Sequence, residues 1–145
     1  MFGSSSGGAR AYAKVGLETG VAAANPHQLI IMLFDGAIVA VKAALVHMDA
    51  RDTEKKGIAI SKAITIINEG MRASLDKKAG GAIAENLDAL YHYMVSRLLQ
   101  ANLNNDPALL NEVLVLLAEL RDAWDAIGGA RPGSGAQLHS VTAQP

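Results

Sequence analysis

Histidines and carboxylates are the side chains of this sequence that could do chemistry. The chain has four histidines, 14 Asp and Glu residues and no cysteine, which excludes disulfides and thiolate metal sites. A di-metal site in a helical bundle needs inward Glu residues on two helices and a Glu-x-x-His pair on the other two. Glu85 is followed by Asp88 rather than by a histidine, and residues 26–49 contain no Glu. The sequence therefore predicts neither a metal site nor a cofactor.

Histidine phosphotransfer is a second chemistry that a helical bundle can carry. It needs an exposed histidine in a context that contains Lys and Gly. His92 lies opposite the apolar face of its predicted helix, but the residues after it do not form a His-x-x-Lys-Gly pattern, and those after His47 do not either. A solvated surface histidine is the simpler interpretation, and phosphotransfer through His92 remains an alternative.

Nucleophilic catalysis and phosphate binding find no support in the pattern. No element suggests a Ser, a His and a carboxylate in convergent geometry. The Gly80-Gly81 pair precedes a predicted helix, but it lacks the strand and the lysine of a phosphate-binding loop, so it reads as an inter-helix turn. We therefore expect a protein that is not an enzyme.

The composition argues against nucleic-acid-binding, secreted and membrane-spanning proteins. At 145 residues the length fits one domain, and a net charge of −1 with 50% hydrophobic residues argues against a nucleic-acid partner. The first eight residues lack the basic start and apolar run of a signal peptide. The longest apolar run, residues 36–41, is far below the roughly 20 residues of a membrane span. The expectation is a cytoplasmic protein without membrane insertion.

Four apolar stripes with helical spacing predict the fold. Asn25 as N-cap, Pro26 at the first position and Gln28 mark the start of a helix over 26–49. Further helices are expected from 52 or 53 to about 75, from about 82 to 104, and from 107 to about 127. Short turns force neighbouring helices to be antiparallel. The predicted fold is an all-α, up-down four-helix bundle over 9–128 with a short N-terminal arm, between disordered segments at 1–8 and 129–145.

The first of these helices is apolar almost all the way round. Only Gln28, Asp35 and Lys42, spaced by seven, share a polar strip. Monomers rarely expose large contiguous apolar patches, so this helix must be covered on several sides. Gly36, in the helix interior, predicts close approach of another backbone there. A self-associating bundle, in which the excess apolar face forms a homodimer interface, is another alternative.

Several stretches closely resemble one known family. They share its colinear order over about residues 9–127. The matching stretches are 25–30, 32–37, 61–63, 66–67, 74–76, 80–87, 90–94, 97–99, 101–106, 112–113, 116–117 and 124. Together they resemble the FliS family of flagellin-specific secretion chaperones.

That resemblance implies a bacterial cytoplasmic export chaperone with an antiparallel helical bundle. Members of the family bind the C-terminal segment of newly made flagellin, which keeps flagellin unpolymerised. They deliver it to the flagellar type III export gate, whose membrane component is FlhA. Flagellin lays amphipathic segments into apolar grooves, so recognition couples to folding of the client. For the free protein, a homodimer remains an alternative.

The resemblance also suggests which residues carry the function. About half of the groove candidates are expected to be bundle core, because periodicity cannot separate inner from outer faces on such apolar helices. The candidates are Ile31, Leu33, Phe34, Ile38, Leu87, Leu90, Tyr91, Met94 and Leu98. Tyr12 matches the tyrosine of the family's N-terminal arm, which can lie over the empty groove and is implicated in contact with the export gate. Val15 is placed in the same arm.

Overall fold

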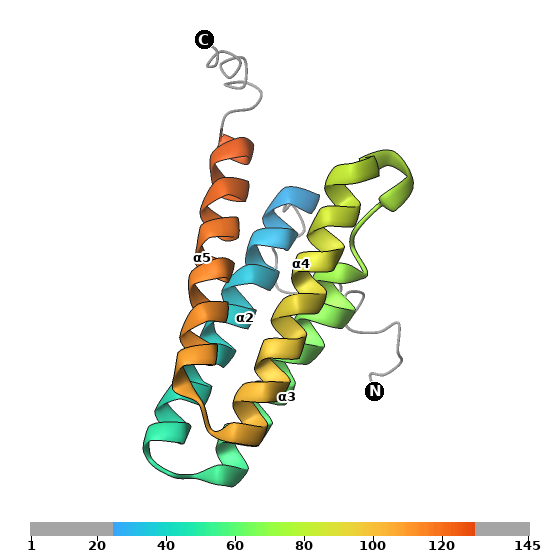
Figure 1. The fold of residues 1–145 in the computed structure, drawn as a ribbon. Helices are drawn as coiled ribbons and strands as arrows, with labels where there is room; N and C mark the ends of the chain where they lie inside the picture. Colours follow the sequence, from blue (N-terminus) through green and yellow to red (C-terminus); the bar gives the residue numbers. More distant parts are fainter. Residues whose placement is uncertain (1–24, 130–145) are drawn as a thin grey trace.

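A computed structural model describes residues 25–129 of the chain (Figure 1). Its elements are α2 (Pro26–Asp49), α3 (Thr53–Thr65), the π-helical segment η2 (Ile66–Arg72), α4 (Lys77–Asn104) and α5 (Pro107–Gly129), with no strand between residues 25 and 129. The predicted all-α four-helix fold is confirmed. The arm with Tyr12 and Val15, the segment 1–8 and the tail after Gly129 lie outside the described residues.

The helices follow one another around a single core. α2 packs against α3 and α5, while α4 packs against α5 and against α3 with η2, so α2 and α4 are diagonal partners. The short turns after α2 and α4 reverse the chain, as Figure 1 shows. The fully buried residues come from every helix. The largest of them are Phe34, Ile60, Ile66, Ile67, Met71, Met94, Leu98, Leu110 and Leu117.

Helix starts are marked by short polar caps. The Asn25 Oδ1 atom accepts a hydrogen bond from the Gln28 N–H at 2.9 Å, and Pro26 follows as the first helical residue, as predicted. Asp52 and Asp106 cap α3 and α5 in the same way. These caps satisfy N–H groups that have no partner inside the helix, so the sequence fixes these three helix starts locally.

The second predicted helix is not a continuous α-helix. Residues 66–72 form a π-helix, whose wider turn shifts the phase of the side chains that follow it. Ile66, which α-helical spacing places at the margin of the apolar face, begins this segment and is only 1% exposed. A Cβ on Gly36 would lie 3.4 Å from the Ile66 Cδ1 atom, an ordinary contact with a side chain, so no backbone of the described helices approaches Gly36 closely, and approach by a partner remains a prediction.

The start of α4 adds one turn to the prediction. Asp76 caps the segment that begins at Lys77, but Gly81 interrupts it with a φ of 55°, so the uninterrupted helix starts at about residue 82, as predicted. Two residues that helical spacing places on the apolar faces of α4 and α5 are exposed: Ile83 at 73% and Ile127 at 65%. Both lie at the end of the bundle where α4 and α5 diverge in Figure 1, so neither helix covers the other there.

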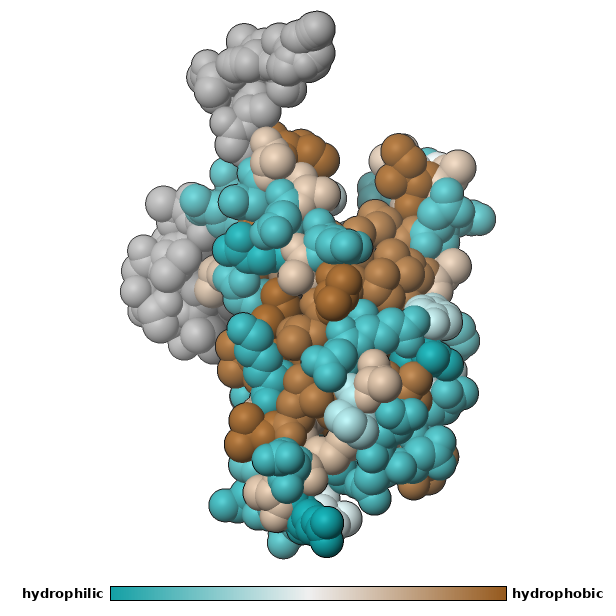
Figure 2. All heavy atoms as spheres, turned by 60° about the vertical axis from the view of Figure 1, so that its left-hand side comes forward, coloured by the Kyte–Doolittle hydropathy of each residue, from teal (hydrophilic) through white to brown (hydrophobic). Residues whose placement is uncertain are grey.

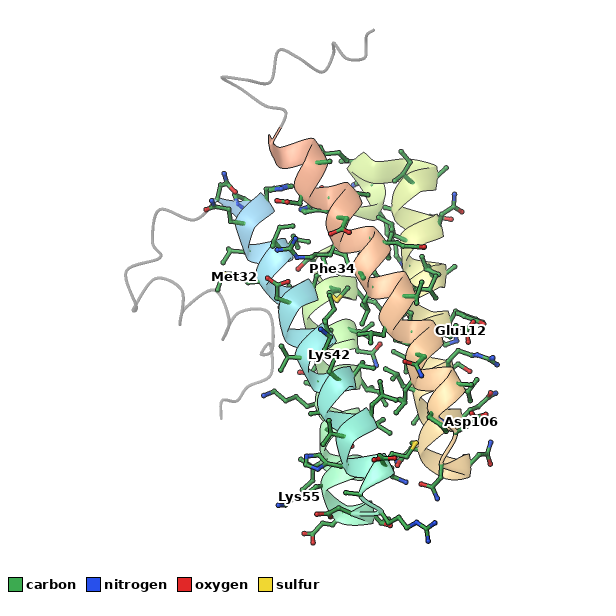
Figure 3. All side chains as sticks on the ribbon, turned by 90° about the vertical axis from the view of Figure 1, so that its left-hand side faces the viewer. Met32, Phe34, Lys42, Lys55, Asp106 and Glu112 are labelled. Carbon is green, nitrogen blue, oxygen red and sulfur yellow. The ribbon has the colours of Figure 1, made fainter. Side chains whose placement is uncertain are left out.

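Helix α2 occupies the centre of the arrangement, between α3 and α5. Among the described helices it alone is long and apolar enough to cross a membrane, a property that core helices of bundles share. One third of its most apolar stretch is buried inside the bundle. Figure 3 shows the contrast on this helix: Phe34 points toward the other helices, and Met32 projects away from them.

Candidate functional site

An apolar pocket of about 420 Å³ opens at the end of the bundle where α2 begins and α5 ends. Its wall is formed by α2, η2 with the turn after it, α4 and α5. The lining residues are Pro26, His27, Leu29, Ile30, Leu33, Met71, Ser74, Leu75, Leu87, Tyr91 and Trp124. Figure 2 shows a hollow with an apolar floor at this end, beside the C-terminal part of α5. A concave apolar site with few polar groups is typical of a binding site.

The wall between α2 and α5 is a stacked pair of rings. The rings of His27 and Trp124 lie 5.4 Å apart and are inclined by only 10°. The indole Nε1 of Trp124 also donates a hydrogen bond to the His27 carbonyl oxygen at 3.3 Å. A Cβ on Gly128 would lie 1.8 Å from the His27 Nε2 atom, so glycine is required for this packing. That buried Nε2 atom has no hydrogen-bond partner within residues 25–129.

The opposite wall is formed by η2 and the turn after it. A Cβ on Gly70 would lie 2.9 Å from the Leu33 side chain, so this glycine allows α2 to approach η2 closely. The Ser74 hydroxyl donates to the Gly70 carbonyl oxygen at 2.6 Å. The chain reversal at the pocket rim is therefore built by close packing of Leu33 on Gly70 and by local hydrogen bonds of residues 70–75.

An ion-pair cluster holds α4 against η2 beside the pocket. The Arg72 Nε atom lies 2.8 Å from the Asp88 carboxylate, and the Lys77 Nζ atom lies 3.0 Å from it. The hydrogen bond from Arg72, followed by that from Lys77, lowers the pKa of Asp88 to about 2. Asp88 is therefore ionised at neutral pH and attached to two cations.

The α4 wall combines Leu87 with Tyr91. Tyr91 is only 4% exposed, and burial raises the pKa of its hydroxyl to about 12. The hydroxyl therefore stays protonated at neutral pH and can donate a hydrogen bond. It places one polar group on a wall that is otherwise apolar.

Outside the pocket lining, α4 and α5 carry further apolar side chains that are not fully buried. Half-buried Leu90, Leu116 and Leu120 pack against the core, and the exposed Ile83 and Ile127 extend the apolar surface outward. Nearer the turn between α4 and α5, polar contacts join the two helices.

An ion pair and a hydrogen bond to one carboxylate join α4 to α5. The Arg97 Nε atom lies 2.8 Å from the Glu112 carboxylate, and the Tyr93 hydroxyl donates to the same carboxylate. These hydrogen bonds, with that from Tyr93 the larger, lower the pKa of Glu112. The two helices are thus joined at one end and open at the other.

The structure separates the nine predicted groove residues into three groups. Leu33, Leu87 and Tyr91 line the pocket. Phe34, Met94 and Leu98 are at most 2% exposed and belong to the core. The half-buried remainder comprises Leu90 on α4 and, on the flank of α2, Ile31 and Ile38.

Sequence reasoning left out several pocket residues. His27, Leu29 and Ile30 belong to the first turns of α2, where an all-round apolar helix gives no signal for one face. Trp124 was assigned to the core face of α5, although it is the only tryptophan of the chain and is half-buried at the pocket. A large amphipathic ring in a chain with 4% aromatic residues was a usable signal.

Comparison with known proteins assigns the chain to a family. A family model described as "Flagellar protein FliS" matches residues 8–131. The Flagellar secretion chaperone FliS of Salmonella typhimurium is 51% identical over 120 residues, which cover 83% of this chain and 89% of that protein. Its counterpart in Escherichia coli is 46% identical, covering 81% of this chain and 86% of the relative. Flagellar secretion chaperone FliSB of Pseudomonas aeruginosa is also 46% identical, covering 80% and 91%.

The family match spans most of the chain, and it includes every residue of the pocket. The relatives are secretion chaperones and not enzymes, which confirms the expectation of a non-enzymatic bundle. On these grounds the chain belongs to the FliS family of flagellar secretion chaperones.

Proposed function

We propose that the protein is a cytoplasmic export chaperone that binds the C-terminal segment of flagellin, keeps it from polymerising and delivers it to FlhA at the flagellar export gate. The observation that carries this proposal is the apolar pocket of about 420 Å³ that residues of α2, η2, α4 and α5 line. An amphipathic helix can lay its apolar face into such a groove.

The divergence of α4 and α5 supports a helical client. Leu87 and Leu90 on one side and Leu116 and Leu120 on the other are packed against the core but still half exposed. A client segment that is disordered when free gains buried apolar area here, which offsets the entropy cost of ordering it. Binding would also cover the apolar surface through which an unfolded export substrate associates with itself.

The residues proposed for client contact are those that line the pocket or lie next to it on α4. Leu33, Leu87 and Tyr91 form the pocket wall, and Leu90 continues it along α4. Core residues such as Phe34 support these positions from below. We assign Tyr12 and Val15 to contact with the export gate, as the resemblance to the family implies.

Two matched substitutions on α4 test the client site. Ile83 precedes the pocket residue Leu87 by one turn and is 73% exposed, whereas Leu103, near the other end of α4, is 82% exposed. Ile83→Asp should weaken binding of a flagellin C-terminal peptide about tenfold or more, because the apolar contact is lost and a charge is desolvated. Leu103→Asp should bind like the parent protein.

Sedimentation velocity with and without the peptide provides the measurement, and far-UV circular dichroism verifies that both variants fold. A heterocomplex of defined stoichiometry supports the proposed function. If the peptide does not bind the parent protein, the function is wrong. If both variants bind alike, the pocket is not the client site.

A further inference from the structure

We propose that the Tyr91 hydroxyl determines which segments the pocket accepts, by donating a hydrogen bond to an amide carbonyl oxygen of the bound client. This role rests on the proposed function, because it is exercised in the same pocket. It adds one chemical requirement to the client. Besides apolar side chains, the client segment must bring an uncharged oxygen acceptor to the wall that α4 contributes.

The other polar groups of the pocket wall are already used or enclosed. The Trp124 Nε1 atom donates to the His27 carbonyl oxygen, and the Ser74 hydroxyl donates to the Gly70 carbonyl oxygen. The His27 Nε2 atom has no partner among the described residues, but it is fully enclosed and lies against Gly128, so a client atom cannot reach it. None of these three groups offers a client a free donor.

The Tyr91 hydroxyl differs from these groups. Tyr93 donates to Glu112, but no hydrogen bond within residues 25–129 uses the Tyr91 hydroxyl, and burial is the cause that raises its pKa to about 12. The group therefore keeps its proton at neutral pH and has no acceptor for it in that range. Its oxygen is not among the fully enclosed atoms without a partner, and the residue lines the pocket, so a client can reach the hydroxyl.

Filling the pocket changes the environment of this hydroxyl. In the empty pocket the hydroxyl can form a hydrogen bond with solvent. A client that fills an apolar pocket expels that solvent, and a buried donor without an acceptor loses the free energy of its hydration. A binding site with such a donor therefore favours a segment that carries an acceptor over an equally apolar segment that lacks one.

The residues around the hydroxyl favour an uncharged acceptor. The pocket is lined by no Lys, Arg, Asp or Glu residue. A client carboxylate would be buried there without a Lys or Arg beside it on the pocket wall, and an unpaired buried charge is strongly unfavourable. An amide carbonyl avoids this cost. It can come from the last turn of a client helix, where carbonyl oxygens lack partners in the helix, or from an Asn or Gln side chain.

Tyr91→Phe tests the hydroxyl alone, because it removes the oxygen and keeps the ring that packs in the pocket wall. The free variant should have the Tm of the parent or a higher one, since no internal hydrogen bond is lost. Its affinity for a flagellin C-terminal peptide should fall about three- to tenfold, the effect of one hydrogen bond. Thermal unfolding followed by circular dichroism measures the Tm, and isothermal titration calorimetry measures the affinity.

Tyr93→Phe is the matched control on the same helix. Its hydroxyl donates to Glu112 on α5 and does not line the pocket. This variant should have a lower Tm in the free state and should bind the peptide like the parent, which is the reverse of the pattern for Tyr91→Phe. If Tyr91→Phe lowers the Tm of the free protein as much as Tyr93→Phe does, the Tyr91 hydroxyl has an internal acceptor and the proposal is overturned.

Nuclear magnetic resonance identifies the acceptor. In the peptide complex the Tyr91 hydroxyl proton should exchange slowly enough to give a resonance that Tyr91→Phe lacks. Its nuclear Overhauser contacts to a labelled peptide distinguish a main-chain carbonyl at a helix end from an Asn or Gln side chain, and either supports the proposal. Contacts to a carboxylate alone overturn it.

The parent protein separates the two possible failures. If the parent binds the peptide and Tyr91→Phe binds it equally well, the role of Tyr91 is wrong and the proposed function stands. If the parent does not bind the peptide, the proposed function is wrong, and the role of Tyr91 fails with it.

Discussion

At the residue scale, the shape of the pocket depends on a few side chains that are packed too closely to tolerate a larger neighbour. His27 is held between the Trp124 ring, which stacks on it at 5.4 Å, and the Gly128 backbone. Gly70 plays the corresponding part on the other wall, where the Leu33 side chain occupies the space of a missing Cβ. Both positions require glycine because a neighbouring side chain lies where a Cβ atom would be, and not because of their backbone conformation.

Gly128→Ala should therefore disturb the pocket although it adds one methyl group. The Cβ would lie 1.8 Å from His27 Nε2, so the stacked ring must move. We expect a loss of about 1–3 kcal/mol in unfolding free energy, the usual cost of overpacking. Trp124 is the only tryptophan, so its fluorescence should shift as the stack opens. His27→Ala combined with Gly128→Ala should relieve the clash. Unchanged emission in Gly128→Ala would contradict the packing.

At the element scale, the helices are joined at their ends by specific polar contacts. Lys56 of α3 is the only buried charged residue within 25–129, at 3% exposed. Its Nζ atom donates to the Asn102 carbonyl oxygen at 3.1 Å and to the Asn105 Oδ1 atom at 2.6 Å. A cation at the C-terminal end of α4 also interacts favourably with the helix dipole. At the other end, Asp88 connects α4 to η2.

Lys56→Met should destabilise the bundle by about 1–3 kcal/mol, because it removes a buried charged donor and leaves two part-buried oxygen atoms without it. Urea unfolding followed by circular dichroism measures the change. Lys55→Met, at the exposed neighbouring position, should stay within about 0.5 kcal/mol of the parent. Equal effects of the two substitutions would show that the contacts of Lys56 are not stabilising.

Asp88 should make stability depend on acid pH. Its folded-state pKa of about 2 lies below the ordinary value of 3.8, so its contribution is present above pH 3.8 and is lost as the pH falls from 3.8 to about 2. Asp88→Asn should therefore unfold at a lower temperature than the parent at neutral pH, and the difference should shrink across that window. Glu85→Gln, at an exposed position of α4, is the matched control. A pH-independent difference would rule out the ion-pair cluster as its cause.

At the scale of the whole molecule, the bundle presents two separate apolar surfaces. The pocket lies at the open end between α4 and α5, and an exposed row on α2, formed by Met32, Val39 and Val46, lies on the outside. The two surfaces share no residue, so each can be changed by substitution without altering the other.

Client binding should stabilise the whole fold, because the pocket is lined by residues of α2, η2, α4 and α5. A flagellin C-terminal peptide at about 100 times its Kd should raise the unfolding free energy by about 2.7 kcal/mol. Thermal unfolding with increasing peptide measures this. The Ile83→Asp variant should need a higher peptide concentration for the same shift. A peptide that binds without raising Tm would mean that it also binds the unfolded chain.

The sequence by itself determined what depends on local chemistry. Caps at Asn25, Asp52 and Asp106 and the apolar spacing of four segments specify where helices run, and short turns specify their antiparallel order. Motifs along the chain also pointed to the family. These features are encoded within a few residues of one another, so they can be read without coordinates.

Only the tertiary structure decided which apolar side chains remain accessible. Periodicity could not separate Leu87, which lines the pocket, from Met94, which is in the core, because both lie on the same helical stripe. Helical spacing did not predict the burial of Ile66, at the start of the π-helix, or the exposure of Ile83, where α4 diverges from α5. Burial depends on what neighbouring helices cover, and that is a property of the assembled bundle.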